Sequence, residues 1–287
     1  MTATAENPVL ALPEFGITPL AEVDTTVDVL GSKSYTNRFL AIAGLSSEPT
    51  TLHNALLSQD TILLAKALQA FGHVEVVFDE VSNTITVTPN GRPMQAPPTD
   101  IHMGNAGTPI RLLISMAGLA HGRTVLTGNE RMQERPMGHL LEALAPLGVQ
   151  ATALRGNGSP PIAIEGPTFV GGPTEIHGTV SSQFTSSLLI SAPYAQQDVE
   201  VTLLDDLLSK PYVDMTVAAM KMAGASWTGA GTSGSLSPRD SVTKAATSPW
   251  NPTRRECRTS SPPPPFWAGG CEYQASMLTP HREISAW

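Results

Sequence analysis

The chain has 287 residues and a formal net charge of −8, with 25 acidic and 17 basic residues. This acidic balance disfavours a general role in binding nucleic acid or a membrane surface, so an anion site would need a local cluster of cations. Cys257 and Cys271 are the two cysteines, and the seven histidines are scattered. Their spacing fits no metal motif, so we expect neither a metal site nor a disulfide framework.

Residues 1–30 contain no basic segment followed by an apolar one, so no signal peptide is expected. The apolar run at 112–120 is too short to span a bilayer. We therefore expect a soluble cytoplasmic protein.

Three similar units are predicted between residues 31 and 225. Each has a polar turn that opens a helix, near Lys33, Gly107 and Ser182, at steps of 74 and 75 residues. A short strand follows each first helix, at 50–53, 124–127 and 199–203. The second helices are expected from near Asp60, Pro136 and Pro211 to Gly72, Gly148 and Gly224. Proline in the first turn and glycine after the last are typical helix boundaries.

A pair of strands is predicted to close each of the first two units. Alternating apolar residues predict strands at 74–78 and 84–87, and a weaker pair at 150–154 and 161–165. A third pair is due after Ala225, but the sequence there does not alternate. We expect this third pair to be missing.

The composition changes at residue 226. All four tryptophans and both cysteines lie beyond this point, and four prolines follow one another at 262–265. Such a segment is typical of a disordered tail, and a polyproline ligand for a partner domain is an alternative. A third hypothesis is a shift of reading frame near Ala225.

Residues 31–38 (GSKSYTNR) carry the first polar cluster, ahead of the apolar run 39–43. This cluster is either an ordinary helix cap with solvated cations or an anion site at a helix N-terminus. The repeat places similar clusters at six helix starts, near residues 33, 60, 107, 135, 182 and 210. Several helix dipoles converging with Lys33, Arg38, Arg111 and Arg135 suit a small substrate bearing phosphate, carboxylate and hydroxyl groups.

Two common phosphate-binding motifs are absent from the sequence. The segment GSKS lacks the Gly-x4-Gly-Lys spacing of a P-loop, and no Gly-x-Gly-x-x-Gly motif follows a strand. We therefore expect no nucleotide cofactor.

Five segments, in this order, resemble those of the 5-enolpyruvylshikimate-3-phosphate (EPSP) synthases, which are enolpyruvyl transferases: GSKSYTNR, GNAGTPIR, RMQERP, SSQFTSSLLISAP and SKPYVDM. The likeness runs from about residue 13 to residue 225. It implies transfer of the enolpyruvyl group of phosphoenolpyruvate to the 5-hydroxyl of shikimate 3-phosphate, with no metal or organic cofactor. The implied fold is α+β, with repeated βαβαββ units in two domains, in a usually monomeric family.

The resemblance also implies site residues. Those for shikimate 3-phosphate are Lys33, Ser34, Arg38, Ser181, Ser182, Gln183, Ser209 and Tyr212. Those for phosphoenolpyruvate are Lys33, Asn105, Gly107, Arg135 and Gln183. Leu30 and Leu112 stand where the family usually has proline. The catalytic Asp/Glu pair of the family has no counterpart that we can assign in this chain.

The resemblance predicts three regions: residues 1–30 from an incomplete domain, a three-unit substrate-binding domain at 31–225, and the aberrant tail at 226–287. Two functional hypotheses follow. The chain is an enolpyruvyl transferase by descent, or it is a truncated or frameshifted product that binds shikimate 3-phosphate weakly, or nothing, and catalyses no reaction. An enolpyruvyl transferase for a UDP-amino sugar is a further alternative.

Overall fold

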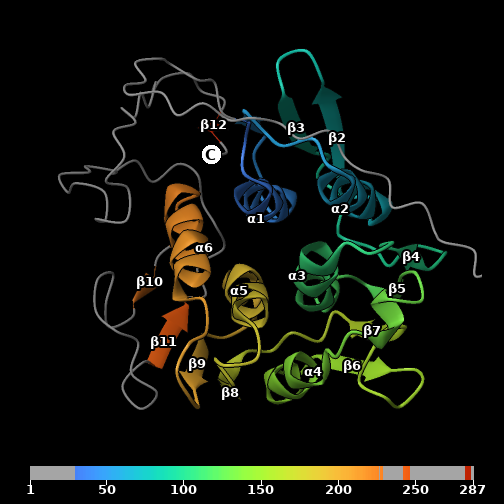
Figure 1. Cartoon of the computed structure of the whole chain (residues 1–287), viewed down its shortest axis with the longest axis vertical. Coiled ribbons are helices and arrows are strands. Elements are labelled where there is room, and N and C mark those ends of the chain that lie inside the picture. The colour runs from blue at the N-terminus through green and yellow to red at the C-terminus, as the bar shows by residue number, and fades with distance from the viewer. Residues whose placement is uncertain (1–29, 226, 229–241, 246–281, 286–287) are drawn as a thin grey trace, which may run out of the picture.

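The computed structural model describes residues 30–225, 227–228, 242–245 and 282–285. The predicted regions 1–30 and 226–287 therefore lie almost wholly outside the described residues. Within the described part, three units follow one another, as the repeat predicted. Figure 1 shows the helices in the middle of the molecule, with the three sheets arranged around them.

The first unit comprises α1 (Lys33–Gly44), β1 (Thr50–His53), α2 (Gln59–Ala70), β2 (Val74–Asp79) and β3 (Thr84–Pro89). The second comprises β4 (Ile101–His102), α3 (Gly107–Ala117), β5 (Gly122–Thr127), the 3₁₀ turn η1 (Met132–Glu134), α4 (Gly138–Leu144), η2 (Ala145–Leu147), β6 (Gln150–Ala153) and β7 (Ile162–Gly166). The third comprises β8 (Gly172–Ile176), α5 (Ser182–Ser191), η3 (Ala192–Tyr194), β9 (Val199–Leu203), α6 (Lys210–Met222), β10 (Trp227–Thr228) and β11 (Val242–Ala245).

The three sheets share one topology. Their strand orders are β12-β1-β3-β2, β4-β5-β7-β6 and β8-β9-β11-β10, and β12 spans Arg282–Ser285. In each sheet the first two strands are parallel and the remaining neighbours are antiparallel. The predicted α+β architecture of repeated units is therefore confirmed.

The expectation that the third strand pair is missing was wrong. β10 and β11 pair with each other, and β11 also pairs with the edge of β9. β7 pairs with β5 in the same way in the second unit. Backbone hydrogen bonds to an exposed strand edge do not require alternating side chains, so the pattern search missed these short strands. The remaining residues of this segment lie outside the described part of the chain.

The core lies around the first helix of each unit. Nine residues of α1, nine of α3 and nine of α5 are buried, whereas α2, α4 and α6 bury five, three and four. Helices buried on nearly all sides have few positions for charged side chains except at their ends. The packing therefore leaves the polar first turns of α1, α3 and α5 as the places where these helices can meet a ligand. No helix in the described ranges is long and apolar enough to cross a membrane.

Candidate functional site

A polar pocket of about 450 Å³ lies where several helices begin. Every lining residue except Gly107 has a polar side chain. The lining residues come from the starts of α1, α2, α3 and α5 and from the turn before α4: Lys33, Gln59, Asp60, Asn105, Gly107, Thr108, Arg111, Arg135 and Gln183. Helix N-termini present free N–H groups and a partial positive charge, so this arrangement favours an anion.

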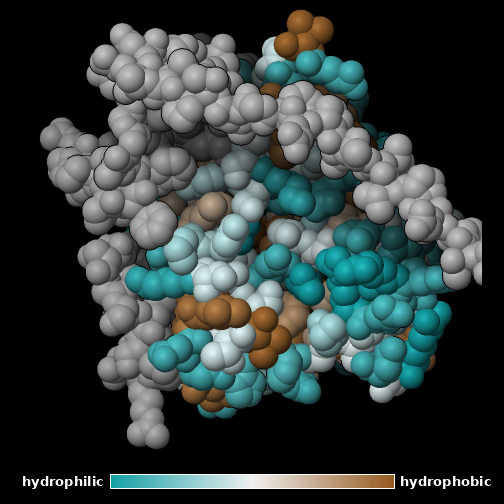
Figure 2. Space-filling view, viewed as in Figure 1, coloured by the Kyte–Doolittle hydropathy of each residue, from teal (hydrophilic) through white to brown (hydrophobic). Residues whose placement is uncertain are grey.

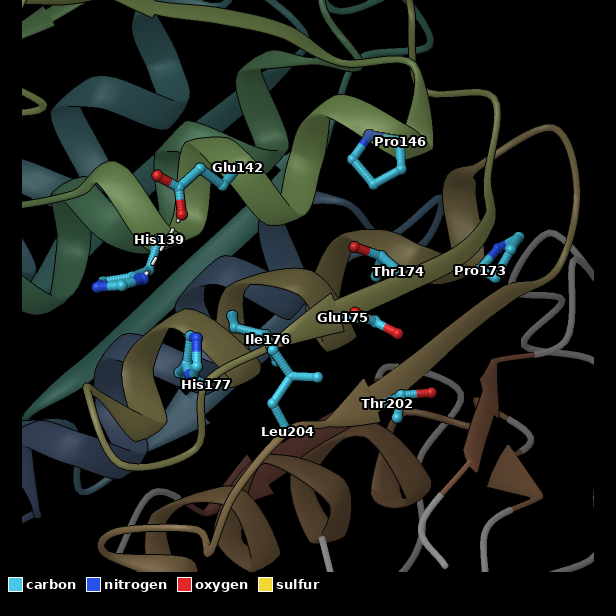
Figure 3. Close-up of a pocket in the computed structure, with 10 residues that line it drawn as sticks. All are labelled: His139, Glu142, Pro146, Pro173, Thr174, Glu175, Ile176, His177, Thr202 and Leu204. Atoms are coloured by element: carbon cyan, nitrogen blue, oxygen red, sulfur yellow. Dashed lines mark ion pairs between the residues drawn. The ribbon is translucent and has the colours of Figure 1, made fainter. Parts of the chain in front are cut away.

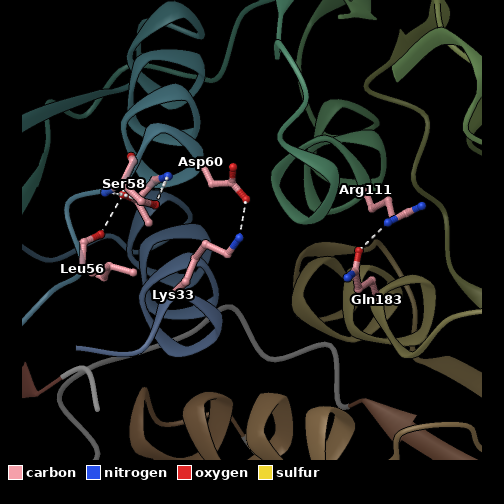
Figure 4. A network of polar contacts seen from close by, with 7 residues as sticks. Lys33, Leu56, Ser58, Asp60, Arg111 and Gln183 are labelled. Atoms are coloured by element: carbon pink, nitrogen blue, oxygen red, sulfur yellow. Dashed lines mark hydrogen bonds and ion pairs between the residues drawn. The ribbon is translucent and has the colours of Figure 1, made fainter. Parts of the chain in front are cut away.

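Three cations and one carboxylate line the pocket. Lys33 Nζ lies 3.3 Å from Asp60 Oδ2, and Arg111 Nη1 donates a hydrogen bond of 2.7 Å to Gln183 Oε1 (Figure 4). Arg135 supplies the third positive charge, and the one carboxylate of the lining, Asp60, is paired with Lys33. The pocket thus carries a formal charge of about +2, which is the electrostatic requirement for a small polyanion.

The two arginines of the pocket repel each other. Burial lowers the pKa of the Arg111 guanidinium, and the nearby charge of Arg135 lowers it further. Arg111 Nε is buried and has no hydrogen-bond partner among the described residues, while its guanidinium carbon lies 5.4 Å from the Phe184 ring centroid. An anion between the arginines would relieve both the repulsion and the desolvation.

Gly107 sets the closeness of the arginines to the α3 N-terminus. A Cβ at this position would collide with Arg135 Nη1 and would lie 3.4 Å from Arg111 Nη1. Only glycine therefore leaves the two guanidinium groups against the backbone where α3 starts. The backbone here is part of the wall of the pocket.

A buried polar layer lies one helical turn below three predicted ligands. Arg38 Nε donates to Thr216 Oγ1 at 2.6 Å, and Arg38 Nη2 donates to Ser186 Oγ at 3.3 Å. Arg38, Ser186 and Thr216 also donate to the carbonyls of Ser34, Ser182 and Tyr212, each four residues earlier. This layer ties α1, α5 and α6 together directly beneath their first turns.

Arg38 itself is 1% exposed, and its guanidinium carbon lies 5.6 Å from the Tyr212 ring centroid. Burial lowers its pKa to about 10, so it remains a cation at neutral pH. Three of its five N–H donors are used by protein oxygens. The structure therefore places Arg38 under the helix starts rather than in the lining of the pocket.

The other predicted residues lie at the same ends of these helices. Ser181 caps α5 and accepts a hydrogen bond of 3.3 Å from the Gln183 amide, and Ser182 is buried. Ser209 precedes α6 in a left-handed conformation, with φ of 59° and ψ of 45°. Tyr212 is half-exposed. Thus all five residues predicted for phosphoenolpyruvate line the pocket, and those predicted for shikimate 3-phosphate gather at the starts of α1, α5 and α6.

Four lining residues were not among the predicted ligands: Gln59, Asp60, Thr108 and Arg111. The sequence marks Arg111 as one of the cations and Asp60 as part of a polar cluster at a helix start. A capping box fixes that start, because the Thr61 amide donates to Ser58 Oγ at 3.4 Å and the Ser58 amide donates to Thr61 Oγ1 at 2.9 Å. The position of Asp60 beside Lys33 follows from the packing of α1 on α2, which the sequence alone did not show.

A second hollow, of about 510 Å³, lies between α4, β8 and β9 (Figure 3). The rings of His139 and His177 meet edge to face there, with centroids 5.4 Å apart, and His139 Nδ1 lies 3.6 Å from a Glu142 oxygen. No group of three potential metal ligands occurs within the described residues. This hollow therefore does not provide a metal centre.

The face that carries the helix starts is mostly hydrophilic. Figure 2 shows teal surface over much of this side and an apolar patch over the loops that lead into α5 and α6. The partly exposed apolar residues of those loops are Val180, Leu204 and Leu208. The polar pocket and the apolar patch thus lie on one side of the molecule.

Comparison with known proteins identifies this architecture. Residues 17–244 match the EPSP synthase (3-phosphoshikimate 1-carboxyvinyltransferase) family. A 3-phosphoshikimate 1-carboxyvinyltransferase of Sulfurovum sp. is 41% identical over 207 residues, which is 72% of this chain and 48% of that protein. One from Methanothermobacter thermautotrophicus is 45% identical over 199 residues, or 69% of this chain and 46% of that protein.

Solved structures agree on the fold. An EPSP synthase from Acinetobacter baumannii superposes with a TM-score of 0.65 at 22% identity, covering 76% of this chain and 47% of that one. The enolpyruvyl transferase NikO from Streptomyces tendae gives a TM-score of 0.56 at 15% identity, covering 91% and 51%. The chain spans about half the length of the relatives it matches.

Proposed function

The chain belongs to the EPSP synthase family, and on this premise we propose that its polar pocket binds the substrates of enolpyruvyl transfer. The substrates are shikimate 3-phosphate and phosphoenolpyruvate, and the products of the transfer are 5-enolpyruvylshikimate 3-phosphate and inorganic phosphate. The observation that carries the proposal is the convergence of Lys33, Arg111 and Arg135 on one pocket at the starts of four helices.

The proposed roles follow the arrangement of charge. Lys33, Arg135 and the amides around Gly107 hold the phosphate and carboxylate of phosphoenolpyruvate, with Asn105 and Gln183 as neutral donors. The starts of α1, α5 and α6 hold shikimate 3-phosphate through Ser34, Ser181, Ser182, Ser209 and Tyr212. Two substrates that each carry phosphate and carboxylate repel each other, so converging cations and dipoles are what brings them into contact.

Arg38 acts in this proposal from below the site. Its hydrogen bonds fix the helices that carry Ser34, Ser182 and Tyr212. Two of its N–H donors remain for a substrate oxygen, so the predicted contact with shikimate 3-phosphate stays compatible with this geometry.

Turnover needs a group that protonates and deprotonates the transferred carbon, and the described lining offers a single carboxylate. Asp60 is that carboxylate, and it is paired with Lys33 at 3.3 Å. We therefore propose that the described residues form the substrate-binding half of the site, and that the 287-residue polypeptide alone binds substrate without turnover.

Phosphorus NMR tests binding and turnover in one sample. Adding the protein should broaden the phosphorus signals of shikimate 3-phosphate and phosphoenolpyruvate, with no growth of an inorganic phosphate signal. Unbroadened signals would refute binding. Growth of the phosphate signal would show that the chain carries its own catalytic groups. The phosphorus signals of a UDP-amino sugar added instead of shikimate 3-phosphate should not broaden. Broadening of the UDP-amino sugar signals without broadening of the shikimate 3-phosphate signal would favour an enolpyruvyl transferase for a UDP-amino sugar.

The proposed substrates are small dissolved anions. We accordingly propose a cytoplasmic monomer that has no nucleic-acid or membrane partner. Size-exclusion chromatography with light scattering tests the monomer, and a mass near 30.3 kDa is the expected result.

A further inference from the structure

Two neighbouring loops of the third unit lead into the helix starts that hold five of the eight residues proposed for shikimate 3-phosphate: Ser181, Ser182, Gln183, Ser209 and Tyr212. The loop after β8 leads to Ser181, and the loop after β9 leads to Ser209. β8 and β9 are parallel neighbours, so the two loops leave the same edge of the sheet side by side. The relative position of the two loops therefore sets the relative position of these two serine hydroxyls.

One carboxylate joins the loops. Asp205, in the second loop, lies with Oδ2 2.6 Å from His177 Nδ1 in the first loop. The Thr179 amide donates to Asp205 Oδ1 at 2.9 Å, and the Thr179 hydroxyl donates to Oδ2 at 3.1 Å. The carboxylate thus accepts from a ring, an amide and a hydroxyl of the opposite loop, and none of these groups belongs to the pocket lining.

The backbones of the loops are also closely packed. The Leu204 amide donates to Ile176 O at 3.0 Å, and the Leu208 amide donates to Gly178 O at 2.9 Å. A Cβ on Gly178 would lie 2.9 Å from Leu207 Cα and 3.0 Å from Asp206 O, closer than a real side chain allows. The loops are therefore packed too closely to admit a side chain at position 178, and Asp205 lies across that contact.

The bridging carboxylate stays ionised over a wide range of pH. The hydrogen bond from His177 lowers the pKa of Asp205 to about 2, burial opposes the change, and the hydrogen bonds from Thr179 add to it. Its charge-assisted hydrogen bonds are of the strong class. The distances in sequence are short, because Thr179 is two residues before Ser181 and Asp205 is four residues before Ser209.

We propose that Asp205 is a positioning residue: it fixes the β8–α5 and β9–α6 loops together and so sets the spacing of Ser181 and Ser209 for the phosphorylated substrate. The inference rests on the proposed function. Ser209 needs such support, since its left-handed backbone is costly for a residue other than glycine. Misplacing a binding group by about 1 Å is enough to change rates up to about 100-fold.

The test compares the substrate affinities of Asp205→Ala and Asp206→Ala by calorimetry. Asp206 is the exposed neighbour, so its replacement removes the same charge from the same loop. Asp205→Ala should weaken shikimate 3-phosphate binding about tenfold or more, whereas Asp206→Ala should stay within about twofold. Phosphoenolpyruvate affinity should change less than shikimate 3-phosphate affinity in Asp205→Ala, because Lys33, Asn105, Gly107 and Arg135 lie on other elements and only Gln183 follows the β8–α5 loop.

A double-mutant cycle shows whether His177 and Asp205 act as a unit. His177→Ala should also weaken shikimate 3-phosphate binding, and the double variant should lose no more than Asp205→Ala alone. Equal affinities of Asp205→Ala and Asp206→Ala would overturn the inference, as would equal losses for both substrates, which indicate general loosening. Failure of the unchanged protein to bind shikimate 3-phosphate would instead overturn the proposed function, and this inference with it.

Discussion

Arg38 shows how a single residue supports the site without lining the pocket. It is buried at the junction of α1, α5 and α6 and donates hydrogen bonds to Ser34 O, Ser186 Oγ and Thr216 Oγ1. The sequence motif assigns such an arginine to the ligand because its neighbours in sequence are predicted ligand residues. The sequence did not show that serine and threonine side chains of two distant helices would surround its guanidinium.

Arg38→Ala tests this supporting role. The change leaves a cavity and removes hydrogen-bond donors from two buried hydroxyl oxygens and one partly buried carbonyl, so we expect the free energy of unfolding to fall by about 2–4 kcal/mol. Denaturant unfolding measures the difference. Arg92→Ala, in an exposed loop, removes the same charge and should change the value by less than about 0.5 kcal/mol. Equal effects of the two variants would contradict a buried supporting layer.

Gly107→Ala tests the other side of the pocket. The new methyl group would collide with Arg135 Nη1, the flexible end of a side chain, so the arginine should move and the fold should persist. We expect phosphoenolpyruvate affinity to fall about tenfold, as for the loss of one charge-assisted hydrogen bond. Calorimetry measures the change.

Gly138→Ala is the matched control, because a Cβ there meets no atom within 4 Å. Its phosphoenolpyruvate affinity should equal that of the unchanged protein. If Gly107→Ala also bound phosphoenolpyruvate with unchanged affinity, Arg135 would not contribute to binding from this position.

At the scale of elements, His73 directly precedes β2 and joins this strand to the end of α1. His73 Nε2 lies 2.7 Å from Gly44 O, and His73 Nδ1 is buried with no hydrogen-bond partner among the described residues. Burial lowers the pKa of His73, and its hydrogen bond to the carbonyl of Gly44 opposes this. The folded protein therefore binds a proton here less readily than the unfolded chain.

This difference predicts a pH dependence of stability. As the pH falls through the unfolded pKa of about 6.5, the unfolded chain takes up the proton first, so the free energy of unfolding decreases. One such group contributes at most about 1.4 kcal/mol per pH unit. Denaturant unfolding measures the free energy of unfolding at pH 7 and at pH 5. Its decrease between these two pH values should be smaller for His73→Gln than for the exposed control His121→Gln. Identical decreases would contradict the assignment to His73.

The secondary structure of the first two units was largely predictable because local signals agree with packing. Proline near the helix start and glycine after the helix end mark α4 with η2, where Gly148 adopts φ of 87°. Apolar alternation marks β2 and β3, which pair with each other along their length. β10 and β11 could not be predicted in this way, since what defines them is the pairing of β11 with β9 and of β10 with β11.

At the scale of the whole molecule, one unit repeats three times and brings equivalent helix starts to one end. α3, the first helix of the second unit, packs against both α1 and α5, and the polar first turns of the three helices meet at the pocket. Lys33 and Gly107 stand 74 residues apart, and Gln183 adjoins Ser182, which follows Gly107 by 75 residues, so the repeat in sequence becomes one site in space. Proximity of Lys33 to Asp60 and of Arg111 to Gln183 could not be predicted, because it depends on how these helices pack.

A second feature of the whole molecule is that the chain spans about half the length of the relatives it matches. The described residues supply cations and helix dipoles for two anions, and one carboxylate that is paired with lysine. Under the proposed function, substrate binding and turnover are separable in this protein, and the described residues provide the binding part.

The most direct measurement of the central claim is a calorimetric titration of shikimate 3-phosphate into the 287-residue protein and its Lys33→Ala variant. The unchanged protein should bind one equivalent, and Lys33→Ala should weaken binding about 10- to 100-fold through loss of charge-assisted hydrogen bonds. Lys66→Ala, an exposed lysine of α2, should leave the affinity unchanged. No heat of binding, or equal affinities for the two lysine variants, would contradict a substrate site at the helix starts.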